Sequence, residues 1–238
     1  MCNLIIDEGN TLCKVAVAKQ GTICELTAVA DITPEFLQQL SEKHPISNII
    51  SISTRRDRVD IPKAFQAIPH LRPNASTKLP IKINYATPQT LGLDRIAAAV
   101  GASVLFPKSN VLIIDLGTAI TIDFLDENNI YQGGVISPGP AMRAKALNTF
   151  TGKLPMVDLP EESKLTGKTT AEALQYGILN GVSYEIDGYI DAYNQLAENL
   201  KIVVTGGFAN IIKRPDVNCE PNLVIIGLNK ILEHSIAS

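Results

Sequence analysis

Several features common in nucleic-acid-binding and secreted proteins are scarce or missing in this chain of 238 residues. Tryptophan is absent and aromatic residues make up 5% of the sequence, so we expect few stacking surfaces for bases or sugars. Lysine and arginine number 21 against 24 aspartates and glutamates, which gives a formal net charge of −3. Such a balance lacks the basic surface that binding to nucleic acid or to an anionic membrane requires.

Cysteine and long apolar runs are also scarce. The four cysteines form no Cys-x-x-Cys pair and have no histidine at zinc-ligand spacing, so we expect reduced thiols in a cytoplasmic protein. The longest apolar runs extend over about five residues, far fewer than the roughly 20 of a membrane-spanning helix. Because the first residues lack a basic segment followed by a long apolar stretch, we expect no signal peptide.

An approximate internal repeat organises what is present. Residues 4–7 and 112–115 both read Leu-Ile-Ile-Asp, and each is followed by a glycine two positions after the aspartate. Each copy predicts a buried strand, a tight Asp-x-Gly turn and a second strand with alternating apolar residues. A third strand and a helix are expected after each pair, at 23–28 and 34–43 in the first copy and at 130–135 and 141–150 in the second.

Two matched β-β-β-α halves predict an α/β fold of two similar lobes. The breaker cluster at 107–110 places the boundary, so that residues 1–108 form an N-terminal lobe and residues 109–238 a C-terminal lobe. The remaining pattern predicts strands at 48–53, 201–205 and 223–226, and helices at 94–105, 170–200 (broken near Gly181 or Gly188) and 228–235.

The two Asp-x-Gly turns are candidate phosphate sites. Asp7 and Asp115 each end a buried strand, where a sheet opens toward ligands, and the glycine lets the turn aim its N–H groups outward. Such a loop can hold phosphate oxygens through its N–H groups while its carboxylate holds a hydrated cation. One copy is a common structural turn, whereas two copies in matching contexts favour a phosphate site shared by the two lobes.

The segment Gly92-Leu93-Asp94-Arg95 stands at the start of an alanine-rich helix. Asp94 could be an ordinary first-turn acid favoured by the helix dipole. It could instead be a general base for a substrate hydroxyl, with Arg95 pairing with a substrate carboxylate. The residues alone leave both interpretations open.

Three further segments contain glycine at a turn. Gly206-Gly207 follows a valine-rich strand and could let an adenosine lie against the backbone of the second lobe. Gly133–Gly139 either shapes the entry into a helix or lines a substrate pocket. Thr166-Gly167-Lys168-Thr169 looks like the end of a P-loop, but Glu162 stands where that motif needs glycine and no buried strand precedes it. We therefore exclude a P-loop.

Taken in order, these motifs resemble the type III pantothenate kinases over the chain from residue 4 to about residue 232. The resemblance rests on seven segments, each weak alone and specific together: Asp7-x-Gly-Asn-Thr, Gly92-x-Asp-Arg, Asp115-x-Gly-Thr-Ala, Gly133-Gly-x-Ile-x-Pro-Gly, Gly167-Lys-x-Thr, Thr205-Gly-Gly-x-Ala, and Pro221-Asn-Leu with Gly227-Leu.

The resemblance implies the two-lobed, ribonuclease H-like fold of the actin, sugar-kinase and heat-shock-chaperone ATPase superfamily, with mixed sheets and flanking helices. It implies ATP-dependent phosphorylation of pantothenate, the first step of coenzyme A biosynthesis, by a homodimer that uses Mg²⁺ and a monovalent cation, K⁺ or NH₄⁺. The implied roles are a base (Asp94), an ATP site (Asp7, Glu8, Gly9, Asn10, Thr11, Leu12, Cys13, Lys14 and Thr118), a pantothenate site (Tyr85, Gly92, Leu93, Asp94, Arg95 and Thr170) and a cation ligand (Asp115).

The chain departs from the family pattern at three positions. Glu8 replaces a small aliphatic residue and adds negative charge near the expected phosphates, so we expect it to face away from them or to approach a cation. Leu12 is also atypical, and Thr169 stands where asparagine usually precedes Thr170, so either threonine could contact the substrate. The apolar helical stretch 171–192 is our expected dimer interface.

Two alternatives remain at this stage. Another small-molecule kinase of the same superfamily would also have paired Asp-x-Gly loops. A regulator that keeps the fold without turnover is expected to lose the base, whereas Asp7, Asp94 and Asp115 are all present.

Overall fold

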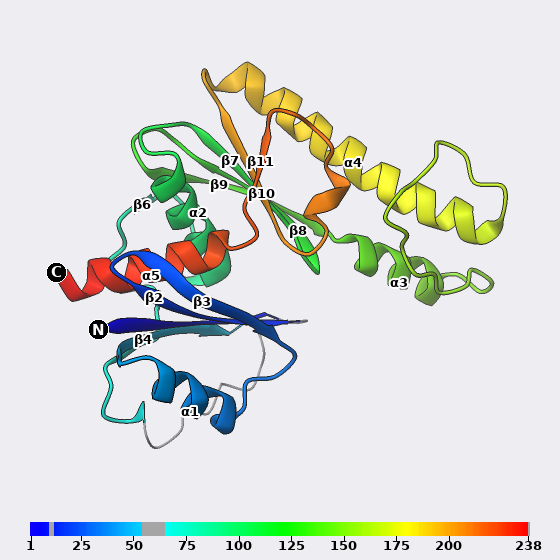
Figure 1. Ribbon diagram of the computed structural model, residues 1–238. Coiled ribbons are helices and arrows are strands. Elements are labelled where there is room, and N and C mark those ends of the chain that lie inside the picture. The colour runs from blue at the N-terminus through cyan, green and yellow to red at the C-terminus, as the bar shows by residue number, and fades with distance from the viewer. Residues whose placement is uncertain (10–11, 54–64, 238) are drawn as a thin grey trace. The chain divides into compact units, whose positions relative to one another are not determined.

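The computed structural model describes residues 1–9, 12–53 and 65–237 (Figure 1). The chain forms two units: the first comprises Met1–Pro107, Asn129–Tyr131 and Asn222–Ser238, and the second comprises Lys108–Asn128 and Gln132–Pro221. The expected lobe 109–238 differs from this second unit, because the C-terminal segment packs with the first. No helix within the described residues is long and apolar enough to cross a membrane.

A five-stranded sheet forms the first unit, in the order β3-β2-β1-β4-β5. Neighbours β1, β2 and β3 are antiparallel, whereas β4 and β5 continue the sheet in parallel from β1. The strands are β1 (Cys2–Glu8), β2 (Cys13–Lys19), β3 (Thr22–Val29), β4 (Ile46–Ser53) and β5 (His70–Leu71).

Helix α1 (Pro34–Lys43) covers one face of this sheet (Figure 1). The Thr33 side chain accepts a hydrogen bond from the Phe36 N–H and so caps the helix, and Pro34 occupies the first turn, where proline is tolerated. The apolar side chains beneath α1 form one buried cluster, which includes Leu4, Ile6, Val15, Val17, Leu37 and Leu40.

Helices α2 (Leu93–Leu105) and α5 (Leu223–Ala237), also in the first unit, pack against each other. Glycine permits their close approach: a Cβ atom at Gly227 would lie 1.7 Å from the Ala97 carbonyl oxygen, and one at Gly101 2.2 Å from the Leu223 carbonyl oxygen. The predicted strand at 223–226 is therefore wrong. A short apolar run does not distinguish a strand from a buried helix, and the contact with α2 favours the helix here.

A six-stranded sheet has the order β11-β10-β7-β8-β9-β6. Its strands are β7 (Val111–Leu116), β8 (Ala119–Leu125), β9 (Ile130–Pro138), β10 (Lys201–Thr205), β11 (Val217–Cys219) and the short β6 (Lys82–Ile83). Strand β7 is antiparallel to β8 and parallel to β10. The β-β-β-α order predicted for both halves is confirmed, since α3 (Pro140–Phe150) follows β9 as α1 follows β3.

Helix α4 (Thr170–Leu196) packs on one face of the β7–β8–β10 portion of the sheet. The expected break near Gly181 or Gly188 is wrong, because α4 is continuous over all 27 residues. A glycine inside a helix costs roughly 1 kcal/mol. The buried apolar face of α4 offsets this loss, with Val182, Ile186 and Ile190 fully buried against the sheet. After Gly207 the chain forms the single 3₁₀ turn η3 (Ala209–Ile211).

Candidate active site

The first Asp-x-Gly segment ends β1 and leads into β2. Asp7 pairs with Lys14 and Glu8 with Cys13 across the antiparallel ladder, so the predicted ATP-loop residues before and after the turn lie on adjacent strands. Leu12 is exposed and Cys13 is buried, with its thiol 3.7 Å from the Ala30 carbonyl oxygen. Gly9 is described, whereas the predicted Asn10 and Thr11 lie outside the described residues.

Asp7 and Glu8 lie on opposite faces of the first sheet, because successive side chains of a strand alternate. Glu8 shares its face with Leu4 and Ile6, which pack under α1, and it is only 7% exposed. Asp7 shares its face with Asn3, whose amide donates a hydrogen bond to Asn229 of α5 at 3.0 Å. The alternation therefore directs Glu8 away from Asp7 and into the interior of the unit.

The candidate base lies in the first turn of α2. The Asp94 carboxylate folds back over Gly92, the N-cap residue, where a Cβ atom would lie 2.4 Å from Asp94 Oδ1. The same oxygen accepts a hydrogen bond from the Arg95 backbone N–H at 2.9 Å. Gly92 leaves space for this carboxylate, and a side chain at position 92 would oblige Asp94 to shift.

Two other residues of the first unit that are predicted to contact the substrate, Tyr85 and Arg95, lie within ten positions of Asp94 in the sequence. Arg95 is buried, at 6% exposure, which is unusual for a charged side chain and indicates a structural or binding requirement. Tyr85 follows β6 and packs its ring against buried Tyr131, with the ring centroids 6.2 Å apart. The Asn84 N–H donates to the Tyr131 carbonyl oxygen at 2.9 Å, so β6 and the start of β9 together position Tyr85.

The second Asp-x-Gly loop joins β7 to β8 and contacts two of the glycine turns noted in the sequence. Gly139 donates its N–H to the Thr118 carbonyl oxygen at 3.0 Å, and a Cβ atom there would lie 2.3 Å from the Gly117 carbonyl oxygen. Gly206, at φ +92°, leaves room for Asp115, since a Cβ atom there would lie 2.5 Å from Asp115 Oδ1. Thr118 itself is exposed. These two contacts place Gly139 and Gly206 beside the second Asp-x-Gly loop, and no spacing rule in the sequence could have identified their partners.

The two threonines at 169 and 170 differ in the structure. Thr169 is the N-cap of α4 and accepts the Glu172 N–H at 3.1 Å, while Glu172 accepts the Lys168 N–H at 2.7 Å. Thr170, the first residue of the helix, is exposed. The Gly-Lys-Thr segment is therefore a helix cap preceded by irregular chain over 151–169, which agrees with the exclusion of a P-loop.

Asp7 and Asp115 each place one carboxylate beside a glycine turn. Within residues 1–9, 12–53 and 65–237, no three histidine, cysteine or acidic side chains gather closely enough to hold an ion. Magnesium in kinases is commonly held by one or two carboxylates together with substrate phosphates and water. The single carboxylate of Asp7 fits that chemistry.

Comparison with known proteins decides the family. The sequence profile of type III pantothenate kinases matches residues 3–192. The type III pantothenate kinase of Cytophaga hutchinsonii is 39% identical over 98% of this chain and 100% of its own length. The chain belongs to the type III pantothenate kinase family. The segments with predicted roles, from Asp7 to Thr170, all fall inside the matched range.

Solved structures support the fold of this type III pantothenate kinase family member. A Baf family protein from Campylobacter jejuni has a TM-score of 0.63 at 21% identity, covering 99% of this chain and 100% of that chain. The activator of 2-hydroxyisocaproyl-CoA dehydratase from Clostridium difficile, solved with bound ADPNP, has a TM-score of 0.57 at 14% identity, covering 100% and 98%. The expected α/β fold with mixed sheets and flanking helices is confirmed, and these solved structures share it.

Proposed function

We propose that this chain transfers the γ-phosphate of ATP to the terminal hydroxyl of pantothenate, the first step of coenzyme A biosynthesis. Family membership over nearly the whole chain supports the reaction class. The observation that carries the residue assignment is the Asp94 carboxylate, held at the start of α2 by Gly92 and the Arg95 N–H.

Asp94 serves as the general base in this proposal. The pantothenate hydroxyl oxygen forms a bond to the γ-phosphorus, the bond from that phosphorus to the β,γ-bridging oxygen breaks, and ADP leaves. Asp94 orients the hydroxyl and accepts its proton. Phosphoryl transfer depends mainly on alignment and charge neutralisation, so one well-placed carboxylate is sufficient protein chemistry at the acceptor.

Both Asp-x-Gly loops bind the nucleotide in this proposal. The Asp7–Lys14 segment binds the phosphates, and Thr118 contacts ATP. Asp7 would help to hold Mg²⁺, which neutralises the triphosphate charge, and Asp115 would hold K⁺ or NH₄⁺. Gly206 adopts a positive φ beside Asp115, and this close backbone approach supports a cation-binding turn at this point.

Pantothenate contacts Tyr85, residues 92–95 and Thr170 in this proposal. Buried Arg95 is suited to the substrate carboxylate, because arginine pairs with carboxylates through two parallel hydrogen bonds. Thr170 is favoured over Thr169, whose hydroxyl already caps α4. The cytoplasmic location stays a prediction.

A homodimer is also part of the proposal, but the apolar content of 171–192 does not support its expected interface. The residues that make this stretch apolar lie inside the second unit, among them Leu174, Ile178, Val182, Ile186 and Ile190. Exposed apolar side chains nearby belong mainly to other segments and include Phe150, Met156 and Leu165.

A coupled assay of ADP release tests the function. With ATP, Mg²⁺ and K⁺, the protein should release ADP only when pantothenate is added, and Asp94→Asn should lower kcat by about 100-fold or more, the scale for a lost general base. The matched control is Glu35→Gln, which removes a first-turn acid from α1 and should leave kcat unchanged.

The same assay separates the alternatives. Turnover with another hydroxylated acid or a sugar, but not with pantothenate, would reassign the chain to a sister kinase. ATP binding without turnover on any acceptor would indicate a regulator. A rate that does not change when K⁺ is omitted would remove the monovalent-cation role of Asp115.

A further inference from the structure

The second phosphate loop depends on a turn that lies outside it. The Thr118 carbonyl oxygen accepts the Gly139 N–H at 3.0 Å, and the absence of a side chain at position 139 lets the two backbones touch. A displacement of residue 139 toward the loop would bring it into the Gly117 and Thr118 carbonyl oxygens. The position of the loop is therefore set in part by whatever holds the turn at 138–139.

Arg143 holds this turn. Its Nε–H donates to the Pro138 carbonyl oxygen at 2.8 Å, and its backbone N–H donates to the Gly139 carbonyl oxygen at 3.0 Å. One side chain thus contacts the residue immediately before the glycine that touches the phosphate loop. Because the donor is charged, the hydrogen bond to Pro138 is stronger than one between neutral groups.

Glu185 of α4 anchors Arg143 from the other side. The Arg143 Nη2–H donates to Glu185 Oε2, and both side chains are only 23% exposed, so solvent screens the pair less than it would at the open surface. The guanidinium passes beside Gly181, where a Cβ atom would lie 3.8 Å from Nη1. The contacts therefore run without interruption from α4 through Arg143 and the 138–139 turn to the Gly117-Thr118 backbone.

We propose that Arg143 and Glu185 are positioning residues for ATP: they fix the 138–139 turn, which fixes the phosphate-binding backbone at Gly117-Thr118. This inference rests on the proposed function only in assigning ATP to the second loop. It assigns neither residue a contact with the reacting atoms. Loss of the pair should loosen nucleotide binding and leave the acceptor site around Asp94 intact.

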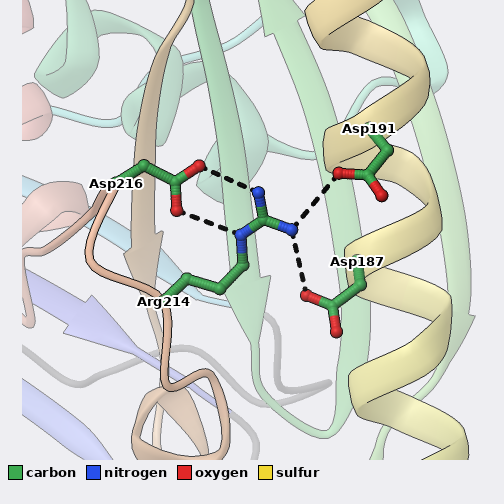
Figure 2. A network of polar contacts seen from close by, with 4 residues as sticks. All are labelled: Asp187, Asp191, Arg214 and Asp216. Carbon is green, nitrogen blue, oxygen red and sulfur yellow. Dashed lines mark hydrogen bonds and ion pairs between the residues drawn. The ribbon is translucent and has the colours of Figure 1, made fainter.

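A second arginine that pairs with α4, Arg214, provides the control. Figure 2 shows Arg214 between Asp216 on one side and Asp187 and Asp191 of α4 on the other. Hydrogen bonding to Asp216, more than that to the two α4 aspartates, holds the pKa of Arg214 above its usual range. None of these three partners belongs to the phosphate loop or to the 138–139 turn. Arg214→Met therefore removes an ion-pair network of α4 without touching the route to Thr118.

Calorimetric titration with Mg–ATP, in the absence of pantothenate, tests the inference directly. Arg143→Met should raise the Kd for ATP about tenfold, which corresponds to about 1.4 kcal/mol. Arg214→Met should bind ATP within about twofold of wild type, a difference too small to count as lost positioning. In steady-state assays Arg143→Met should raise KM for ATP and leave KM for pantothenate unchanged.

Two further variants protect the test against a folding defect. Glu185→Gln keeps a hydrogen-bond acceptor and should raise the Kd for ATP a few-fold. Arg143→Lys keeps the charge toward Glu185 but loses the planar set of guanidinium donors, so its Kd for ATP should lie between those of wild type and Arg143→Met. Combining Arg143→Met with Glu185→Gln should weaken ATP binding no more than Arg143→Met alone, because the two residues act in one chain of contacts.

The outcomes distinguish this inference from the proposed function. If wild type binds ATP and Arg143→Met binds it equally well, or if Arg143→Met and Arg214→Met weaken it equally, the positioning role is wrong. If wild type itself binds no ATP, the proposed function is wrong. Unchanged ATP affinity with a lowered Tm would reduce the Arg143–Glu185 pair to an ordinary stabilising contact.

Discussion

The two Asp-x-Gly loops share a sequence pattern but differ in how the protein supports them. In the first, which joins β1 to β2, a Cβ atom at Gly9 would lie 2.9 Å from the Leu12 carbonyl oxygen, within the same turn. The second joins β7 to β8 through residues 117–118 and is touched by Gly139 and Gly206 from other segments. The described contacts of the second loop therefore come from distant segments, and we expect this loop to be sensitive to changes elsewhere in its unit.

The largest effect is expected from Gly206→Ala, which breaks the external support of the second loop. The new methyl group would collide with Asp115 Oδ1 and with the Leu116 backbone, in a residue whose φ of +92° already disfavours a side chain. We expect kcat/KM for ATP to fall by roughly 10- to 100-fold, the scale of 1–3 kcal/mol of backbone strain.

The neighbouring Gly207→Ala is the control, because open space surrounds that position. It should retain the wild-type kcat/KM for ATP. Equal losses in the two variants would mean that the whole turn tolerates no side chain, and the specific contact with Asp115 would lose its importance.

A smaller effect is expected from Gly9→Ala in the first loop. Among the described residues, a Cβ atom at Gly9 would lie 2.9 Å from the Leu12 carbonyl oxygen, a less severe overlap than the one at Gly206. We expect KM for ATP to rise about two- to fivefold, less than 1 kcal/mol.

Gly177→Ala serves as a reference for this measurement, since it lies in α4 with nothing near the added methyl group and should stabilise the helix by up to about 1 kcal/mol. Should Gly9→Ala prove as damaging as Gly206→Ala, the contrast between the two loops would be wrong.

The smallest expected effect is a difference between the two units in how their stability depends on pH. All three histidines lie in the first unit, and burial, with a smaller contribution from Arg72, lowers the pKa of His70 from 6.5 to about 4. As the pH falls, His70 therefore takes up a proton in the unfolded protein before it does so in the folded protein. The stability that neutral His70 contributes is present above pH 6.5 and is lost as the pH falls through about 4.

Thermal unfolding between pH 7 and 4.5 measures this effect. His70→Gln can still form a hydrogen bond with Ser51, and its Tm should fall less on acidification than that of wild type. The difference should be on the order of a few degrees, because the His70 ring is only half-buried. Hydrogen exchange of the second unit is the internal reference, since that unit contains no histidine. A pH response of the same size in both units would contradict the assignment to His70.

Local patterns were sufficient for the regular parts of the fold. The alternation and the Leu-Ile-Ile-Asp repeat predicted β1 and β7, and the apolar spacing predicted α1 and α2, because these signals come from neighbours within a few residues. They failed where a distant partner decided the outcome. Residues 223–226 are helical because α2 offers glycine-lined contact, and α4 stays continuous through Gly181 because the sheet buries its apolar face.

In the candidate site too, some residues could be predicted from the sequence, whereas others were recognised only in the tertiary structure. Asp7, Asp94 and Asp115 could be selected from sequence, since each stands two positions from a glycine at a strand end or a helix start and their order matches the family. Glu8 was noticed as a departure, but its burial on the α1 side of the sheet follows from strand alternation together with packing. The hydrogen bond from Gly139 to Thr118, and the pairing of Arg143 with Glu185, could not have been found from sequence. No periodicity links residues 118, 139 and 185.

The amino-acid sequence by itself therefore determined the chemical groups of this kinase, their turns and the duplicated order of its strands, since those depend on covalent neighbours and on short-range backbone preferences. Only the tertiary structure decided which backbone segments approach closely enough to need glycine, which arginine contacts the 138–139 turn and which pairs with Asp187 and Asp191 of α4. Those outcomes depend on packing between residues far apart in the chain, where a single methyl group or hydrogen bond selects one arrangement over others of the same pattern.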